Sequence, residues 1–326
     1  MTLMITNEDT KKLPLSIKTA IPLIEDTFRQ AGEGTAENPA RYRMPFKNNG
    51  FVQFGPAALH AKGVAGFKMW ANFGKETGVH KNSGHATNYL YDMATGELLA
   101  LIHSSTIGWY RTSAATAVAV KYLSPENAST VGLFGAGHIA AGQLEAVCAV
   151  RPIRQARVYS RTPKDREAFC HRMSEQLGVN VIPATSPEEV PRNAEIVVTA
   201  STAETPVLFG DWLTGPGLVV AVGANHWYRR ELDEKAVAWA DLIIVDGKEQ
   251  SKVESGNLLW AIAHGATTWE RVKELGDVVT GHVPKPNFKN TSILFGGHGL
   301  AINDVAISAK AYELAQAAGI GSKISL

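Results

Sequence analysis

The sequence predicts an α/β protein in which a doubly wound parallel sheet follows a domain built on an antiparallel sheet. At residues 131–142 a short apolar strand breaks into glycines and then resumes at helical spacing, as dinucleotide-binding folds require. From residue 130 onward, short apolar strands alternate with helical segments. This alternation is typical of a parallel sheet covered by helices on both faces.

The first part of the chain predicts one helix followed by several strands. Residues 15–31 repeat apolar side chains at helical spacing, with Ser16 as a cap and Pro22 as either a kink or the true start. An antiparallel sheet is then predicted, with strands at residues 51–54, 66–72, 87–91 and 98–103. An alanine-rich helix at 112–122 leads into Ser124, where we place a domain boundary.

The second part predicts parallel strands at residues 131–134, 156–160, 179–183, 196–200, 218–222 and 242–245. After residue 256 the pattern is largely helical, and a closing helix is expected at 301–318. We therefore expect a first domain at 1–124, a dinucleotide-binding domain at 125–300, and a C-terminal segment at 301–326 that returns to the first domain.

The glycine-rich turn is the candidate cofactor site. Gly135 would make the tight turn, Gly137 would let a pyrophosphate approach the backbone, and Ala140 fits the third, close-packing position. A tight strand-to-helix turn without any ligand can show the same glycines. The second strand, which follows after one helix length, favours the cofactor interpretation. The residues expected at the cofactor are Gly135, Ala136, Gly137, His138 and Ile139.

The end of the second strand bears on cofactor choice. An acidic residue there would bind the ribose diol of NAD(H), but this chain has Ser160, Arg161 and Thr162. Arg161 can pair with a 2′-phosphate, so the sequence favours NADP(H); a solvated Arg161 would leave NAD(H) possible. Another strand ends in small residues that either line the cofactor or cap the following turn, namely Thr199, Ala200 and Ser201.

The composition is that of an ordinary globular protein. Over 326 residues the net charge is +1 and charged residues make up 19%, so nothing favours nucleic acid or a membrane surface as a partner. The N-terminus lacks the pattern of a secretory signal, and we expect a cytoplasmic protein. Cys148 and Cys170 are expected to pack as small apolar groups, and no His and Cys spacing predicts a metal site.

Several motifs match one family in the order in which it carries them. Besides the dinucleotide loop and the strand around Lys68, they lie at residues 39–45, 85–87, 92–97, 110–115, 222–225, 230–233, 245–250 and 274–278. With them the chain resembles the ornithine cyclodeaminase and mu-crystallin family nearly end to end. The resemblance implies a homodimer whose N-terminal and C-terminal segments form a substrate and dimerisation domain around an inserted Rossmann domain.

The resemblance also implies a substrate site. By position in the motifs, Arg41, Lys68 and Arg111 match residues that bind the substrate carboxylate, with Thr87 lining the same pocket. An arginine supplies a planar fork that fits a 2-imino or 2-amino carboxylate. Arg43 competes with Arg41, and the spacing of the two flanking prolines favours Arg41. Arg111 could alternatively cap or pair locally at the start of its helix.

Asn225 departs from part of the family. The cyclodeaminases carry an Asp at the matching position, and an amide cannot act as a general base at neutral pH. Ketimine reductases of the mu-crystallin type also lack that Asp, so Asn225 favours a reductase over a lyase. His85 either donates the proton that accompanies hydride transfer or is a structural donor, and Asp304 is either a helix cap or a substrate contact.

The sequence therefore predicts an NAD(P)H-dependent reductase of a small imino acid. The substrate would be a cyclic ketimine such as pyrroline-2-carboxylate or an acyclic imine such as iminosuccinate, and Lys68 is the expected proton donor. Three alternatives stay open: an ornithine cyclodeaminase that retains NAD⁺, an amino acid dehydrogenase of the alanine type, and an NADPH-dependent ligand carrier.

Overall fold

The computed structural model describes residues 1–47, 50–72 and 85–325. The chain forms two compact units, unit 1 with Met1–Thr112 and Gly299–Leu326, and unit 2 with Ser113–His298. The first boundary falls inside helix α3 (Ser105–Leu123), whereas the sequence analysis expects it at residue 124. The physical reason is that the second half of α3 bonds to unit 2, where Thr116 Oγ1 donates to Oε1 of Gln143.

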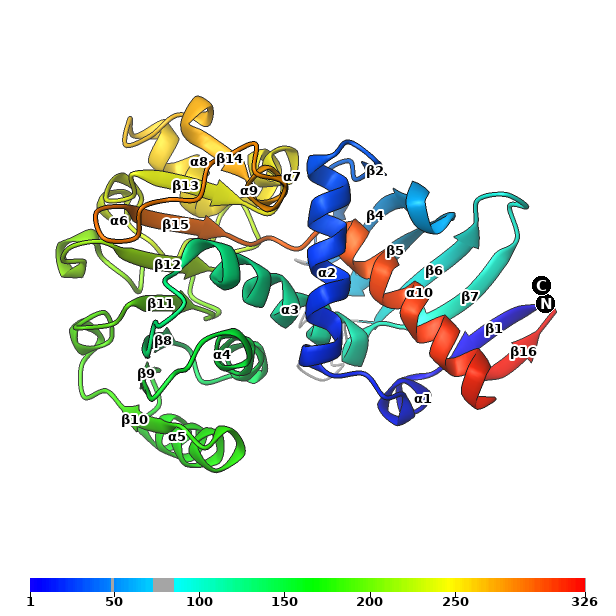
Figure 1. Ribbon diagram of the computed structural model, residues 1–326, viewed down its shortest axis with the longest axis horizontal. Coiled ribbons are helices and arrows are strands. Elements are labelled where there is room, and N and C mark those ends of the chain that lie inside the picture. Colours follow the sequence, from blue (N-terminus) through cyan, green and yellow to red (C-terminus); the bar gives the residue numbers. More distant parts are fainter. Residues whose placement is uncertain (48–49, 73–84, 326) are drawn as a thin grey trace. The chain divides into compact units, whose positions relative to one another are not determined.

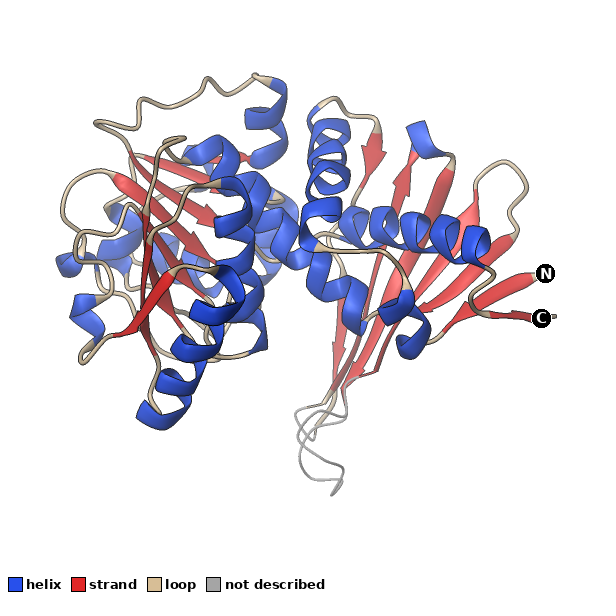
Figure 2. Cartoon of the chain, turned by 60° about the horizontal axis from the view of Figure 1, so that its bottom comes forward, coloured by secondary structure: helices blue, strands red, loops and turns tan. Residues whose placement is uncertain are grey.

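Unit 1 is built on an eight-stranded sheet in the order β16-β1-β7-β6-β5-β4-β2, with β3 paired to β4 (Figures 1 and 2). Its pairs are antiparallel except for β1 with β7. The strands are β1 Thr2–Ile5, β2 Ala36–Glu37, β3 Tyr42–Pro45, β4 Phe51–Leu59, β5 Val64–Asn72, β6 His85–Asp92, β7 Leu98–His103 and β16 Ser322–Ile324. The other helices of unit 1 are α1 Asn7–Lys12, α2 Ile17–Gly32 and α10 Ala301–Ala318.

Helix α10 packs across β4, β5 and β6 and lies beside α2, although the two helices come from opposite ends of the chain (Figure 1). Two buried hydrogen bonds fix α10 in place. Thr27 Oγ1 on α2 lies 2.6 Å from Oδ1 of Asn303, and Asn88 Nδ2 on β6 donates to Oγ of Ser308 at 2.7 Å. Since buried polar groups must be paired, these bonds set the rotation of α10 about its axis. That rotation turns Asp304, the neighbour of Asn303, toward the sheet.

Strand register decides which side chains face α10. Lys68 on β5 lies directly opposite Gly55 on β4 and Asn88 on β6, so these three residues share one face of the sheet. Because Asn88 bonds to α10, this is the face that α10 covers. Met69 and Thr87, which pair with each other, lie on the other face.

Unit 2 is an eight-stranded parallel sheet in the order β10-β9-β8-β11-β12-β15-β13-β14. Its strands are β8 Thr130–Phe134, β9 Gln155–Tyr159, β10 Asn180–Pro183, β11 Ile196–Thr199, β12 Gly217–Ala221, β13 Leu242–Val245, β14 Val272–Glu274 and β15 Ser292–Gly296. Its helices are α4 His138–Val150, α5 Pro163–Leu177, α6 Glu234–Ala238, α7 Lys248–Glu254, α8 Gly256–Ala263 and α9 Leu275–Thr280.

The strand order of unit 2 reverses between β8 and β11. From β8 the chain first moves outward through β9 and β10 and then returns to the other side of β8. Such a reversal is where doubly wound folds bind dinucleotides, at the carboxyl ends of the strands. The predicted Rossmann fold is therefore confirmed. Among the helices that the structure describes, none has both the length and the apolar character that a bilayer crossing needs.

Candidate active site

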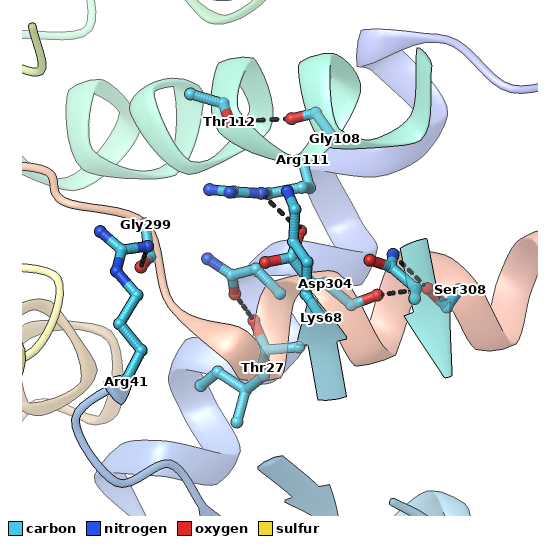
Figure 3. Close-up of polar contacts among 12 residues, drawn as sticks. Thr27, Arg41, Lys68, Gly108, Arg111, Thr112, Gly299, Asp304 and Ser308 are labelled. Atoms are coloured by element: carbon cyan, nitrogen blue, oxygen red, sulfur yellow. Dashed lines mark hydrogen bonds and ion pairs between the residues drawn. The ribbon is translucent and has the colours of Figure 1, made fainter. Parts of the chain in front are cut away.

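Two cations, Lys68 and Arg111, meet the carboxylate of Asp304 on the α10 face of the unit 1 sheet (Figure 3). One oxygen of Asp304, Oδ1, accepts from Nε of Arg111 at 2.9 Å and from Nζ of Lys68 at 3.3 Å. The side chains of Asp304, Arg111 and Lys68 are only 5%, 9% and 17% exposed. The cluster is thus largely removed from water, where charges interact strongly.

This environment changes the proton affinity of Lys68. Burial, together with the nearby charges of Arg111 and Arg41, lowers the pKa of Lys68 from 10.5 to about 8, although Asp304 pulls the other way. Burial opposes ionisation of Asp304, but Arg111 and Lys68 outweigh it, so that the pKa of this carboxyl lies below its usual value. Lys68 is therefore an ammonium at neutral pH and can give up its proton readily.

Arg41 reaches the same region from the segment before β3. Its Nη1 donates to the carbonyl oxygen of Gly299 at 3.2 Å, just before α10 begins (Figure 3). Gly299 has φ +82°, and a Cβ there would lie 2.5 Å from Nη1 of Arg111. No residue with a side chain fits this position, which brings the backbone close to both guanidinium groups.

The structure places two residues for which the sequence analysis left alternatives, Arg43 and Asp304. Arg43, the rival of Arg41, donates from Nε to Oε1 of Gln53 at 2.8 Å and stacks on Phe51. Asp304 is not a helix cap, because the N-cap of α10 is Leu300 and Asp304 lies within the helix. Its role as the partner of Lys68 and Arg111 is one that the sequence analysis missed.

His85 and Thr87 are not brought to this cluster. Both alternate with Asn88 on β6, so their side chains lie on the sheet face away from α10. There Thr87 pairs with His103 of β7. Burial, and secondly the charge of His85, lower the pKa of His103, which indicates that the two histidines are near each other.

The glycine-rich loop of unit 2 has the geometry of a dinucleotide turn. Gly135 has φ +119°, and a Cβ there would lie 2.5 Å from the carbonyl oxygen of Ala200. A Cβ at Gly137 would meet no atom within 4 Å, so its backbone is open to a ligand. Gly137 is also the N-cap of α4, and the amino end of a helix is where backbone amides favour an anion.

The carboxyl end of β9 has no acidic side chain. Ser160, Arg161 and Thr162 follow the strand, and Thr162 is the N-cap of α5. Arg161 is exposed, whereas Arg166 donates from Nη1 to the carbonyl oxygen of Ser160 at 2.7 Å and lies over Tyr159. Arg161 is thus the cation at this strand end with an accessible side chain.

A buried carboxylate, Glu231, ties two strand ends together. Its Oε1 accepts from both the amide and the hydroxyl of Ser201, each at 2.7 Å. Its Oε2 accepts from Thr199 Oγ1 and from the amide of Gly223, each at 2.8 Å. Burial raises the pKa of Glu231 against the effect of these bonds. The hydroxyls of Thr199 and Ser201 therefore bind Glu231, a residue that the sequence analysis did not single out.

Asn225 and His298 also lie in unit 2. Oδ1 of Asn225 is 2.8 Å from Nδ1 of His226, just beyond the carboxyl end of β12. The amide of His298 donates to Oδ2 of Asp246 at 2.8 Å, and its ring nitrogen Nδ1 lies 3.5 Å from Oδ1 of the same residue. The predicted residues thus fall into two groups: Arg41, Lys68 and Arg111 in unit 1, and the cofactor loop with Asn225 in unit 2.

Comparison with known proteins identifies the relatives. The model of the ornithine cyclodeaminase/mu-crystallin family matches residues 1–319. A Δ¹-pyrroline-2-carboxylate reductase of Bacillus cereus is 32% identical over 288 residues, which cover 88% of each chain.

Two solved structures have the same fold over the whole chain. The Δ¹-pyrroline-2-carboxylate reductase of Thermococcus litoralis, in complex with NADH and L-proline, has a TM-score of 0.93 at 32% identity and covers 99% of this chain and 100% of its own. An archaeal alanine dehydrogenase dimer with bound NAD has a TM-score of 0.92 at 29% identity, with coverage of 100% and 99%.

Proposed function

Because the chain belongs to the ornithine cyclodeaminase/mu-crystallin family, we propose that it is an NAD(P)H-dependent reductase that converts a small imino acid to the amino acid. The observation that carries the proposal is the pairing of Lys68 and Arg111 with the carboxylate of Asp304, with Arg41 near enough to lower the pKa of Lys68. Two cations, Lys68 and Arg111, share one oxygen of this carboxylate, so a further anion beside them would be electrostatically favourable. A 2-imino carboxylate supplies one.

The two arginines bind the carboxylate. Arg111 uses Nε for Asp304 and keeps its terminal nitrogens for a planar carboxylate, and Arg41 adds a second guanidinium. Holding the carboxylate at two points fixes the orientation of the adjacent C=N bond. The Δ¹-pyrroline-2-carboxylate reductases among the relatives act on a substrate of this class by name.

Lys68 is the proton donor in this proposal. When bound, the reduced nicotinamide supplies the hydride that the C=N carbon accepts. In the same reaction an Nζ–H bond of Lys68 breaks and an N–H bond forms on the substrate nitrogen, which leaves Lys68 neutral until solvent protonates it again. The lowered pKa of Lys68 suits this exchange near neutral pH.

Asn225 argues against a cyclodeaminase. Lyase chemistry at this position needs a carboxylate that accepts a proton and stabilises a cationic intermediate. The amide of Asn225 offers neither, and its oxygen lies within hydrogen-bonding distance of His226. An amino acid dehydrogenase of the alanine type remains the second candidate, since it would use the same residues and an archaeal alanine dehydrogenase has the same fold.

For the cofactor we propose NADP(H) in preference to NAD(H). The glycine loop fits a dinucleotide because Gly135 allows the tight turn at positive φ and Gly137 leaves the backbone open. At the end of β9 the exposed Arg161 can pair with a 2′-phosphate, and no acid there would repel it. The two solved relatives contain NADH and NAD, so the proposal of NADP(H) rests on the residues of this chain alone.

A homodimer through the unit 1 sheet is also proposed. Neither α2 nor α10 covers the other face of this sheet (Figure 2), where Phe54 and Met69 are 43% and 38% exposed. Phe67 and Tyr89 stack on it with ring centroids 4.4 Å apart. A groove of about 420 Å³ runs beside Phe67. Exposed apolar surface of this kind is favourable for a subunit contact.

The proposal is tested by two substitutions that separate the roles. Arg111→Ala should raise KM for the imino acid because it removes a carboxylate contact, while Lys68→Ala should lower kcat by about a hundredfold or more because it removes the proton donor. Full turnover by Lys68→Ala would contradict the assignment of Lys68.

A further inference from the structure

A glycine interrupts the interior of α3 directly beside Lys68. A Cβ on Gly108 would lie 3.4 Å from Nζ of Lys68 and 3.3 Å from Oγ of Ser104, and it would meet no third atom within 4 Å outside the neighbouring backbone. Glycine is unfavourable inside a helix. Without a Cβ here, the ammonium of Lys68 and the hydroxyl of Ser104 both come within 3.4 Å of one point beside Gly108.

The hydroxyl of Ser104 is buried and lacks a partner in the part of the chain that the structure describes. The residue is 1% exposed, and its Oγ makes no hydrogen bond with any described residue. Leaving a buried hydroxyl unbonded is unfavourable, and such groups commonly bind an ordered water. By contrast, Thr112 on the same helix satisfies its own hydroxyl by donating to the carbonyl oxygen of Gly108 at 2.8 Å.

The ammonium of Lys68 has more N–H donors than the one that bonds to Asp304. The charged groups that face it are Asp304 on α10, Arg111 on α3 and Arg41 before β3. Among the residues that the structure describes, Nζ donates to Oδ1 of Asp304 at 3.3 Å, and Arg111 shares that oxygen. An ammonium carries three N–H groups, so a second acceptor would stabilise its charged form.

We propose that Ser104 is a positioning residue for Lys68, which acts through one water held in the space beside Gly108. The water oxygen accepts from Nζ of Lys68 and donates to Oγ of Ser104. Two polar partners that reach one point are what a bridging buried water requires. The inference rests on the proposed function only in giving Lys68 the role of proton donor, because the water itself acts on the protonation of Lys68.

The test measures the protonation of Lys68 in the full-length protein without substrate. The rate at which acetic anhydride modifies Lys68 is followed against pH by peptide mass spectrometry. Ser104→Ala removes the hydroxyl, and Gly108→Ala fills the space with a methyl group. Each should lower the pH of half-maximal labelling by about one unit, since the ammonium loses an acceptor. Ser105→Ala, one residue along and exposed, is the matched control and should leave it unchanged.

Unchanged labelling midpoints in both variants would overturn the inference. Gly108→Ala keeps the test decisive if Ser104→Ala does not fold, because alanine is the better helix former. The pH profile of imine reduction gives a second reading, in which the limb on the basic side should move down by the same amount. If the wild-type protein reduces no imine, the proposed function fails while the labelling result still decides the role of Ser104.

Discussion

The ammonium nitrogen of Lys68 lies 3.3 Å from Oδ1 of Asp304, a residue 236 positions further along the chain. The same oxygen accepts a hydrogen bond from Nε of Arg111. Asp304→Asn would therefore leave two largely buried cations without their counter-charge. We expect the free energy of unfolding to fall by about 3 kcal/mol or more, and imine reduction to fall with it. Urea unfolding and steady-state kinetics would measure both.

A matched control for this change is Asp211→Asn. Asp211 pairs with Lys235 at 2.7 Å, but both side chains are exposed, 69% and 64%. Exposed ion pairs contribute little, so this variant should unfold like the wild type. If the two variants lost the same stability, burial of the Asp304 cluster would not be the cause.

The depressed pKa of Lys68 predicts a stability that depends on pH. In the folded protein Lys68 loses its proton near pH 8, whereas the unfolded lysine does so near 10.5. Between these values the unfolded chain binds more protons, so the contribution of Lys68 to the free energy of unfolding rises with pH. The free energy of unfolding of the wild type minus that of Lys68→Met should rise by about 3 kcal/mol over this range. A difference that stays constant from pH 8 to 10.5 would contradict the lowered pKa.

Arg161 should determine the preference for the phosphorylated cofactor. Replacing it by Glu removes a cation and adds a charge that repels a 2′-phosphate. We expect KM for NADPH to rise about tenfold to a hundredfold while KM for NADH changes little. Arg192→Glu, at another exposed arginine of unit 2, should alter neither value. Equal use of both cofactors by the wild type would show that Arg161 is only a solvated charge.

Glu231→Gln should weaken cofactor binding, because Glu231 ties together strand ends at the edge where a doubly wound fold binds a dinucleotide. Each carboxylate oxygen accepts from a backbone amide, of Ser201 or of Gly223, and an amide NH₂ cannot replace either oxygen without facing a donor. Glu195 is the matched control, since its Oε2 accepts from the amides of Ser129 and Thr130 at the amino ends of the strands. Glu195→Gln should lower stability but leave the dissociation constant for NADPH unchanged, whereas Glu231→Gln should raise it. Calorimetric titration at a temperature where both variants are folded would distinguish them.

Much of unit 2 was predictable because its signals are local. The turn at Gly135 needs a positive φ, and each βαβ unit repeats a pattern that a short window of sequence contains. The domain boundary was less predictable, because nothing in the composition of α3 indicates that its two halves pack with different units.

The candidate site in unit 1 depends on pairings between distant segments. Resemblance to a family brought Arg41, Lys68 and Arg111 together, but the position of Thr87 depends on which strand face it occupies, and register is not readable from one strand alone. Asp304 carried one usable signal. It is an acidic residue in the first half of an alanine-rich helix, and a buried acid needs a cationic partner.

Imine reduction is tested most directly by following the absorbance of NADPH and NADH. The protein is incubated with cyclic ketimines, or with 2-oxo acids plus ammonia or methylamine. Ornithine with NAD⁺ is run in parallel. Reduced cofactor should be consumed with at least one imine, and the corresponding amino acid should accumulate. Release of ammonia from ornithine without net change in the cofactor would contradict the proposed function, and would assign the site to a cyclodeaminase despite Asn225.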